Sequence, residues 1–201
     1  MKNALLLEAS EWAKATFGDV RLGDKRRSER VVRIVTLMAT QSDVCLPGMM
    51  KSKAELKATS HLFETPDVTS ESLMRPHLQQ TGAQAWSHQR VLLIQDTTDL
   101  NYSQHPKTTG LGPLKNQKQH GMLLQTVLAV DAQEKHILGI MHQEPFLRKL
   151  APQQETRAQR LKRERESHVW ERSAAALGRP PQGVEWIHVG DRGSDIHPHL
   201  F

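Results

Sequence analysis

Two short apolar runs in this chain each lead into an aspartate. Residues 91–95 are apolar except for Gln95 and precede Asp96, and residues 184–190 carry four large apolar side chains before Asp191. Runs of this kind are typical of strands that are buried on both faces of a sheet. If the two strands are parallel neighbours, their carboxyl ends lie at one edge, and the two carboxylates approach each other. An aspartate at a strand end also commonly caps the following turn, so both interpretations remain open.

The first part of the chain has helical periodicity. Apolar positions recur at helical spacing, and the sequence predicts helices over residues 11–17, 25–39, 51–63 and 70–80. Asp24 stands where the second of these helices needs a capping side chain. We therefore expect a helical domain over residues 1–88.

Residues 89–201 have a different pattern. Strands are predicted over residues 91–95, 122–130, 136–142 and 184–189, with one long charged helix over residues 153–177 before the last strand. The order is therefore β-β-β-α-β. A strand meander followed by a helical crossover to a strand parallel with the first is how a ribonuclease-H-like fold begins, and such crossovers are right-handed. The expected fold class is α/β, with a helical domain followed by the first part of a ribonuclease-H-like domain.

The net charge of this 201-residue chain is +5, and the excess is concentrated in two stretches. Residues 1–57 hold eleven Lys or Arg against seven Asp or Glu, and residues 148–172 hold eight against four. A basic surface favours a polyanion such as nucleic acid as partner. Four arginines recur at helical spacing in the first stretch and can share one helix face: Arg26, Arg27, Arg30 and Arg33. A solvated basic face is the alternative interpretation.

Cysteine usage and hydropathy indicate the compartment. Cys45 is the only cysteine, which excludes an intramolecular disulfide and fits a reducing environment. The apolar run at residues 4–7 is too short for the core of a signal peptide, and no segment approaches the ~20 apolar residues that span a bilayer. We expect a cytoplasmic protein without membrane contact.

Several separate motifs resemble those of bacterial DDE transposases of the insertion-sequence-four type. The residues around the two aspartates, 96–102 and 191–197, are similar to the aspartate motifs of that family. The resemblance also covers earlier and intermediate segments: Trp12-Ala13 with Phe17-Gly18, the run from Leu22 to Arg30, Ser52-Lys53-Ala54, His61-Leu62-Phe63 with Pro66 and Val68, and Gly110-Leu111-Gly112-Pro113.

The resemblance implies a function for each domain. The helical domain would bind double-stranded DNA at the terminal inverted repeats of a transposon, through Arg26, Arg27, Arg30, Arg33 and Lys53. Asp96 and Asp191 would be catalytic metal ligands for Mg²⁺ or Mn²⁺, hard cations that prefer carboxylate oxygens. The family acts as a homodimer in the bacterial nucleoid.

The family also needs a third carboxylate, a Glu within a Tyr-Arg-Glu-Lys signature on a later helix. No Tyr follows Tyr102, so that signature is not in this sequence. The resemblance therefore implies a chain that stops before the catalytic Glu and lacks the dimerisation region, and we expect it to be inactive alone. If another residue supplies the missing carboxylate, Glu144 is the first candidate.

Two other functions remain open from the sequence. A DNA-binding protein could occupy transposon ends without cutting them and act as an inhibitor. An unrelated metal-dependent hydrolase could use the acidic and histidine-rich tail, because His-x-His can bind zinc. The residues of that tail are Asp191, Asp195, His197 and His199.

Overall fold

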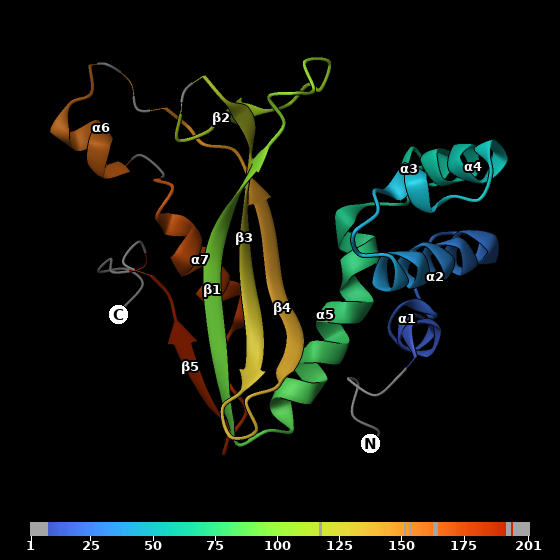
Figure 1. Ribbon diagram of the computed structural model, residues 1–201. Coiled ribbons are helices and arrows are strands. Elements are labelled where there is room, and N and C mark those ends of the chain that lie inside the picture. The colour runs from blue at the N-terminus through green and yellow to red at the C-terminus, as the bar shows by residue number, and fades with distance from the viewer. Residues whose placement is uncertain are drawn as a thin grey trace. The chain divides into compact units, whose positions relative to one another are not determined.

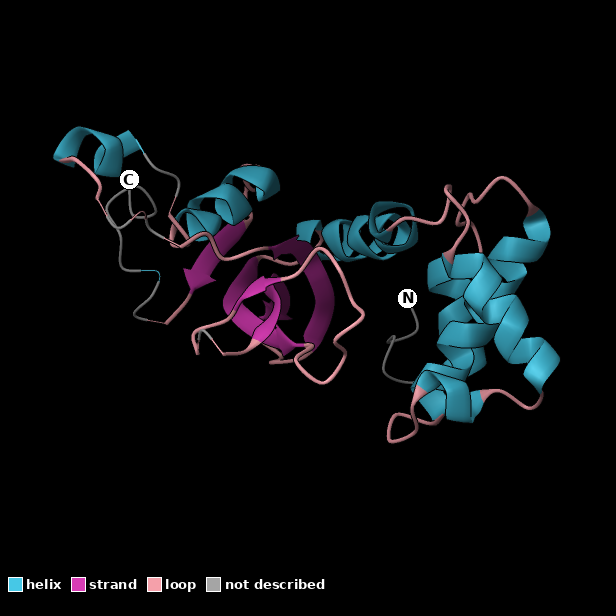
Figure 2. Ribbon diagram, turned by 90° about the horizontal axis from the view of Figure 1, so that it is seen from above, coloured by secondary structure: helices cyan, strands magenta, loops and turns pink. Residues whose placement is uncertain are grey.

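The computed structural model describes residues 8–116, 118–150, 152, 154–162, 165–191 and 194, with the backbone alone described for residues 160–162. The protein is α/β: helices come first in the chain and a mixed sheet follows (Figure 1). Two compact units are present, Met1–Gln80 and Thr81–Phe201. All strands in the described ranges belong to the second unit (Figure 2). No helix in that part of the chain has the length and apolar character needed to cross a membrane.

The first unit consists of helices. These are α1 (Ala9–Phe17), α2 (Lys25–Thr40), α3 (Leu46–Met49), α4 (Lys53–Phe63) and the first part of α5 (Ser70–Trp86). The helices expected over residues 11–17, 25–39 and 51–63 are present with similar bounds. The short α3 was not expected, and α5 continues to Trp86 rather than ending at residue 80.

Side-chain caps fix where α2 and α4 begin. The carboxylate of Asp24 accepts the N–H of Arg26 at 2.8 Å, which confirms the expected cap of α2. The hydroxyl of Ser52 accepts the N–H of Glu55 at 3.1 Å and caps α4 in the same way. Such bonds satisfy backbone donors that have no partner within the helix and stabilise it by about 1 kcal/mol each.

The helices pack around one apolar cluster. Its buried members come from α1, α2, α4 and the loops beside them: Phe17, Val20, Leu22, Val31, Ile34, Leu62 and Val68. Trp12 packs against this cluster and meets Phe17 edge to face at 5.9 Å. The apolar stripe of α2 thus faces inward, and Arg26 and Arg33 are exposed on the outer side of the helix.

The second unit is built on a five-stranded mixed sheet. Its strands are β1 (Arg90–Asn101), β2 (Gly112–Pro113), β3 (His120–Asp131), β4 (Ile137–Phe146) and β5 (Glu185–Val189). The hydrogen-bonded order is β2-β3-β1-β5, and β4 also pairs with β3. β1 is antiparallel to β3 and parallel to β5 (Figure 1). The expected parallel pairing of the first and last strands is present.

Two expected elements differ from the structure. β1 was expected over residues 91–95 but continues to Asn101, because β3 is long enough to pair with it as far as Asn101 and Gly121. Where one long helix was expected over residues 153–177, the structure has α6 (Arg157–Lys162) and α7 (His168–Leu177).

The two faces of the sheet have different surroundings. Along β1 and β3 burial alternates, and the buried cluster Val91, Leu93, Val127 and Ala129 lies on one face with Ala85 of α5 and Leu177 of α7 packed against it. On the other face, Ile94 and Val189 are 37% and 40% exposed. This differs from the expectation of a first strand buried on both faces.

Replacing Leu93 tests the position of this core. Leu93 is fully buried at the centre of the sheet, so Leu93→Ala should lower the free energy of unfolding by about 2–5 kcal/mol through lost burial and the cavity left behind. Leu150 is 57% exposed and gives the matched control. Leu150→Ala should change stability by less than about 0.5 kcal/mol in the same denaturant titration. Equal losses in the two variants would contradict the assigned core.

We expect the stability of the helical unit to depend on pH through His77. The ring of His77 is half-buried and stacks on Phe17 at a centroid distance of 6.4 Å. Burial lowers the pKa of His77 below its ordinary 6.5. The unfolded chain therefore binds this proton at a higher pH than the folded chain does. Stability is lost as the pH falls through 6.5 toward the folded pKa.

His77→Phe keeps an aromatic ring against Phe17 and removes the titration. The difference in melting temperature between pH 7.5 and pH 5 should therefore be smaller in this variant than in the wild type. Thermal denaturation at the two pH values measures it. An unchanged difference would mean that His77 does not prefer its neutral form in the folded chain.

Candidate functional site

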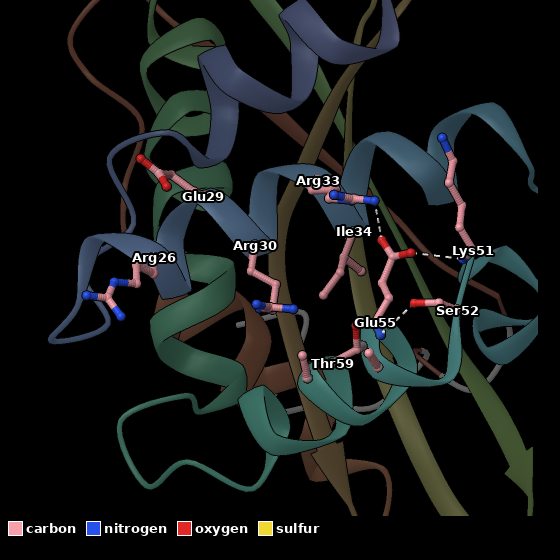
Figure 3. A pocket seen from close by; sticks show the side chains of 11 residues that line it. Arg26, Glu29, Arg30, Arg33, Ile34, Lys51, Ser52, Glu55 and Thr59 are labelled. Carbon is pink, nitrogen blue, oxygen red and sulfur yellow. Dashed lines mark hydrogen bonds and ion pairs between the residues drawn. The ribbon is translucent and has the colours of Figure 1, made fainter.

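A groove of about 700 Å³ lies between α2 and α4 in the helical unit (Figure 3). Both helices supply its walls, with residues from the turn that precedes α4. The lining residues are Arg26, Glu29, Arg30, Arg33, Ile34, Lys51, Ser52, Ala54, Glu55, Ala58 and Thr59. Four cations therefore face two carboxylates, and the groove has a positive balance.

Glu55 holds the two walls of the groove together. Its side chain is only 13% exposed and forms a 2.5 Å ion pair with Arg33 of α2. The other carboxylate oxygen accepts the N–H of Lys51 at 2.8 Å, so Glu55 also fixes the turn before α4 (Figure 3). A buried carboxylate needs such partners because removing it from water is costly. The guanidinium of Arg33 therefore already has a carboxylate partner within the protein.

Arg27 has internal partners as well. Its guanidinium donates to the carbonyl oxygen of Leu22 at 2.7 Å and to the carboxylate of Asp67 at 3.0 Å. These bonds tie the start of α2 to the turn before α5 and to the loop before α2. Arg27 thus contributes to the architecture of the unit, although it was expected to contact DNA.

Arg26 and Arg30 have the positions that a polyanion could reach. Arg26 is exposed and Arg30 is half-buried, and both line a second hollow of about 300 Å³ between α2 and α4 as well as the groove itself. Within the described residues, no carboxylate forms an ion pair with either side chain. Their guanidinium groups keep donors that can bind a phosphate oxygen.

Lysines extend this positive surface at the start of α4. Lys53 is exposed, and Lys51 lines the groove. Sequence reasoning selected Lys53 and missed Lys51 and Glu55. The Ser52 cap marks the turn that presents these side chains, but the sequence alone does not show that α4 faces α2. Positive partial charge at the helix N-terminus adds to the field here.

The sheet unit holds the two aspartates of the sequence analysis. Asp96 is exposed and lies within β1, where it pairs with Thr126 of β3, so it does not end the strand as expected. Ile94 is the partner of Val189 in the last pair between β1 and β5. Asp96 comes two positions after Ile94, and Asp191 comes two positions after Val189. Asp191 is exposed too.

A ladder of polar side chains crosses β5, β1 and β3 beside this position. The side-chain amide of Gln95 lies 2.8 Å from Nδ1 of His188, and the amide of Gln125 donates to the side-chain oxygen of Gln95 at 3.3 Å. Thr97 donates to the side-chain oxygen of Gln125. Gln95 and Gln125 are almost completely buried, so these bonds favour one register of β5 against β1.

Glu144 lies on the opposite face of the sheet from Asp96. It pairs with Gln125, whose side chain belongs to the buried face, whereas Asp96 alternates with Gln95 and points the other way. The Nη2 and Nε groups of Arg172 in α7 both donate to one carboxylate oxygen of Glu144, at 2.7 and 3.0 Å. Glu144, the first candidate if another residue of this chain supplies a third carboxylate, is therefore an ion-pair partner of α7 on the face opposite Asp96.

The zinc alternative depended on the end of the chain. Asp195, His197 and His199 lie outside the residues that the structure describes.

One comparison with known proteins bears on the helical unit. Residues 9–68 match a family described as "Transposase DNA-binding". The matched segment contains α1, α2, α3 and α4, and therefore both walls of the arginine-lined groove. Residues 9–68 are thus similar to the DNA-binding regions of transposases.

Proposed function

We propose that this protein is a DDE transposase that binds the inverted-repeat ends of a bacterial insertion sequence through the groove between α2 and α4. The proposal rests on the observation that the segment matching transposase DNA-binding domains contains a groove with two arginines that have no carboxylate partner among the described residues. We also propose that the protein belongs to the insertion-sequence-four type, acts as a homodimer and is located in the bacterial nucleoid.

The contacts in the helical unit suggest that its cations have different roles. Arg26 and Arg30 contact phosphates, because their guanidinium groups are not engaged by carboxylates of the described chain. Arg33 and Arg27 keep α2 in place through Glu55 and Asp67. Lys53 adds an exposed charge at the first turn of α4. Phosphate contacts of this kind position a protein on DNA, and contacts to base edges provide sequence selection.

Salt dependence of DNA binding tests these roles. Each phosphate contact contributes about −0.9 to the slope of log K against log salt concentration, so Arg26→Ala/Arg30→Ala should reduce the slope by about two and weaken binding. Arg75→Ala is the control, because Arg75 lies in the same unit and pairs with Glu71 at 2.7 Å. Fluorescence anisotropy with duplex DNA at several salt concentrations gives both slopes. An unchanged slope in the double variant would show that this face is only solvated.

Asp96 and Asp191 are the proposed catalytic carboxylates. Three features support the pair: both side chains are exposed, both follow the last β1–β5 pair by two residues, and the Gln95–His188 contact favours that register. Exposed carboxylate oxygens fit Mg²⁺ or Mn²⁺. When bound, such an ion would activate the attacking oxygen and stabilise the leaving oxygen of a phosphodiester. The two side chains would hold the ion, and the parallel strands would position them.

The β-sheet connectivity supports a ribonuclease-H-like fold for this unit. An antiparallel arrangement of β1, β3 and β4 precedes α6 and α7, after which β5 returns parallel to β1. This is the β-β-β-α-β order expected from the sequence, with two differences. The crossover consists of two helices, and the short strand β2 is an additional element.

Metal-induced stabilisation tests the carboxylate pair. Mg²⁺ that binds only the folded state should raise the melting temperature, and Asp96→Asn should abolish that rise because one ligand is lost. The same change removes like-charge repulsion, so the metal-free variant should be slightly more stable. Asp99→Asn, in the same strand and also exposed, should keep the Mg²⁺ response. A full response in Asp96→Asn would rule out Asp96 as a ligand.

A DNA-binding protein that occupies transposon ends without cutting them is the second candidate. It rests on the match of residues 9–68 to a family whose description concerns DNA binding and not cleavage. A nicking assay on duplex carrying the element's ends separates the two candidates. Mg²⁺-dependent nicking that is abolished by Asp96→Ala would support the transposase. Tight binding without nicking would support the DNA-binding protein that does not cut.

A further inference from the structure

Three potential metal ligands converge near the start of β1. His88 lies just before β1, Asp131 is the last residue of β3, and His136 comes just before β4. Asp131 pairs with Val91 near the start of β1. Asp96 is five positions after Val91, which is about 17 Å along a strand. The group is therefore separate from the proposed carboxylate pair.

The hydrogen bonding of His88 suits a metal ligand. Its Nδ1 lies 2.7 Å from the carbonyl oxygen of Gln84. A carbonyl oxygen can only accept, so Nδ1 carries the hydrogen and Nε2 keeps its lone pair. Histidines that bind metals commonly donate their other ring N–H to a carbonyl in this way, which fixes the tautomer and the orientation of the ring.

Asp131 places a negative charge inside the group. It is 3% exposed, and its two oxygens accept the N–H groups of Gln133 at 3.0 Å and Glu134 at 3.3 Å. Burial raises the pKa of Asp131, but those bonds lower it, as do His88 and His136 when their rings are protonated, so the net pKa lies below the ordinary value. The carboxylate is therefore ionised at neutral pH and can still offer a lone pair.

His136 completes the set from the other side of the hairpin. Its Nδ1 lies 3.9 Å from the Asp131 carboxylate and 3.5 Å from the carboxylate of Glu134, distances too long for strong hydrogen bonds. The rings of His88 and His136 approach edge to face with centroids 5.8 Å apart. One potential ligand atom from each of His88, Asp131 and His136 lies within 4.8 Å of the others.

We propose that His88, Asp131 and His136 bind Zn²⁺ and thereby tie the starts of β1 and β4 to the end of β3. Two imidazoles and one carboxylate are a donor set that zinc accepts, and a water or the exposed Glu134 would supply the fourth position. Bonds of about 2.0–2.2 Å put tetrahedral ligands roughly 3.3 Å apart. Side-chain rotations that close the group by about 1.5 Å would reach that geometry. The proposal does not depend on the DNA function.

Titration of the full chain with Zn²⁺ and Co²⁺ tests the site. One Co²⁺ per chain should give the visible absorption of a tetrahedral site, and Zn²⁺ should displace it and raise the melting temperature. His88→Gln and His136→Gln, made separately, should each weaken Zn²⁺ binding at least tenfold. Circular dichroism of each metal-free variant confirms that the fold is kept, and if one variant does not fold, the other carries the test.

The chain has eleven histidines, so a control is needed for Zn²⁺ binding by histidines outside the proposed site. His197→Ala/His199→Ala removes the alternative His-x-His pair and should bind Zn²⁺ as the wild type does. Wild-type affinity in a folded His88→Gln or His136→Gln variant would overturn the proposal. So would loss of binding in the His197/His199 variant, or the absence of the Co²⁺ absorption in the wild type.

Discussion

The proposed DNA-binding face depends on the bonds of the carboxylate of Glu55, whose side chain is only 13% exposed. This carboxylate accepts the backbone of Lys51 at the start of α4 and pairs with Arg33 on α2, so it joins the two walls of the groove and sets their spacing. Without it, Arg33 would be one more mobile cation on a helix surface. With it, α2 is held in an orientation that leaves Arg26 and Arg30 facing the groove.

The sheet unit depends in a similar way on the register of β1. This strand pairs along its whole length with β3, but with β5 only as far as Ile94 and Val189. The bonds of Gln95 to His188 and Gln125 would be broken by a one-residue slip, because a slip reverses the face of every side chain. The same register governs both ends of the strand: Asp96 follows the last β5 pair, and Val91 brings Asp131 toward His88.

Much of the fold could be predicted from the sequence, because its signals are local. Helical periodicity and the Asp24 cap located α2, and two apolar runs located β1 and β5 and suggested that they are parallel. The extension of β1 through residues 97–101 has little apolar signal. It is determined by the length of β3, which a local pattern does not contain.

The site residues were harder to assign, because their roles depend on contacts between distant segments. Spacing placed Arg26, Arg27, Arg30 and Arg33 on one helix, but only tertiary structure separates the two that bind Asp67 and Glu55 from the two that remain available. Glu144 was close in sequence to the end of a strand, yet the alternation of side chains puts it on the face covered by α7. The convergence of His88 with Asp131 and His136 requires the hairpin register.

The central claim is that DNA lies on the α2–α4 groove and is contacted by Arg26 and Arg30. Arginine modification with phenylglyoxal, read residue by residue by mass spectrometry with and without duplex DNA, tests it most directly. The account predicts that DNA protects Arg26 and Arg30 and leaves the reactivity of Arg75 unchanged. Full reactivity of Arg26 and Arg30 in the DNA complex, with protection confined to arginines of the sheet unit, would contradict it.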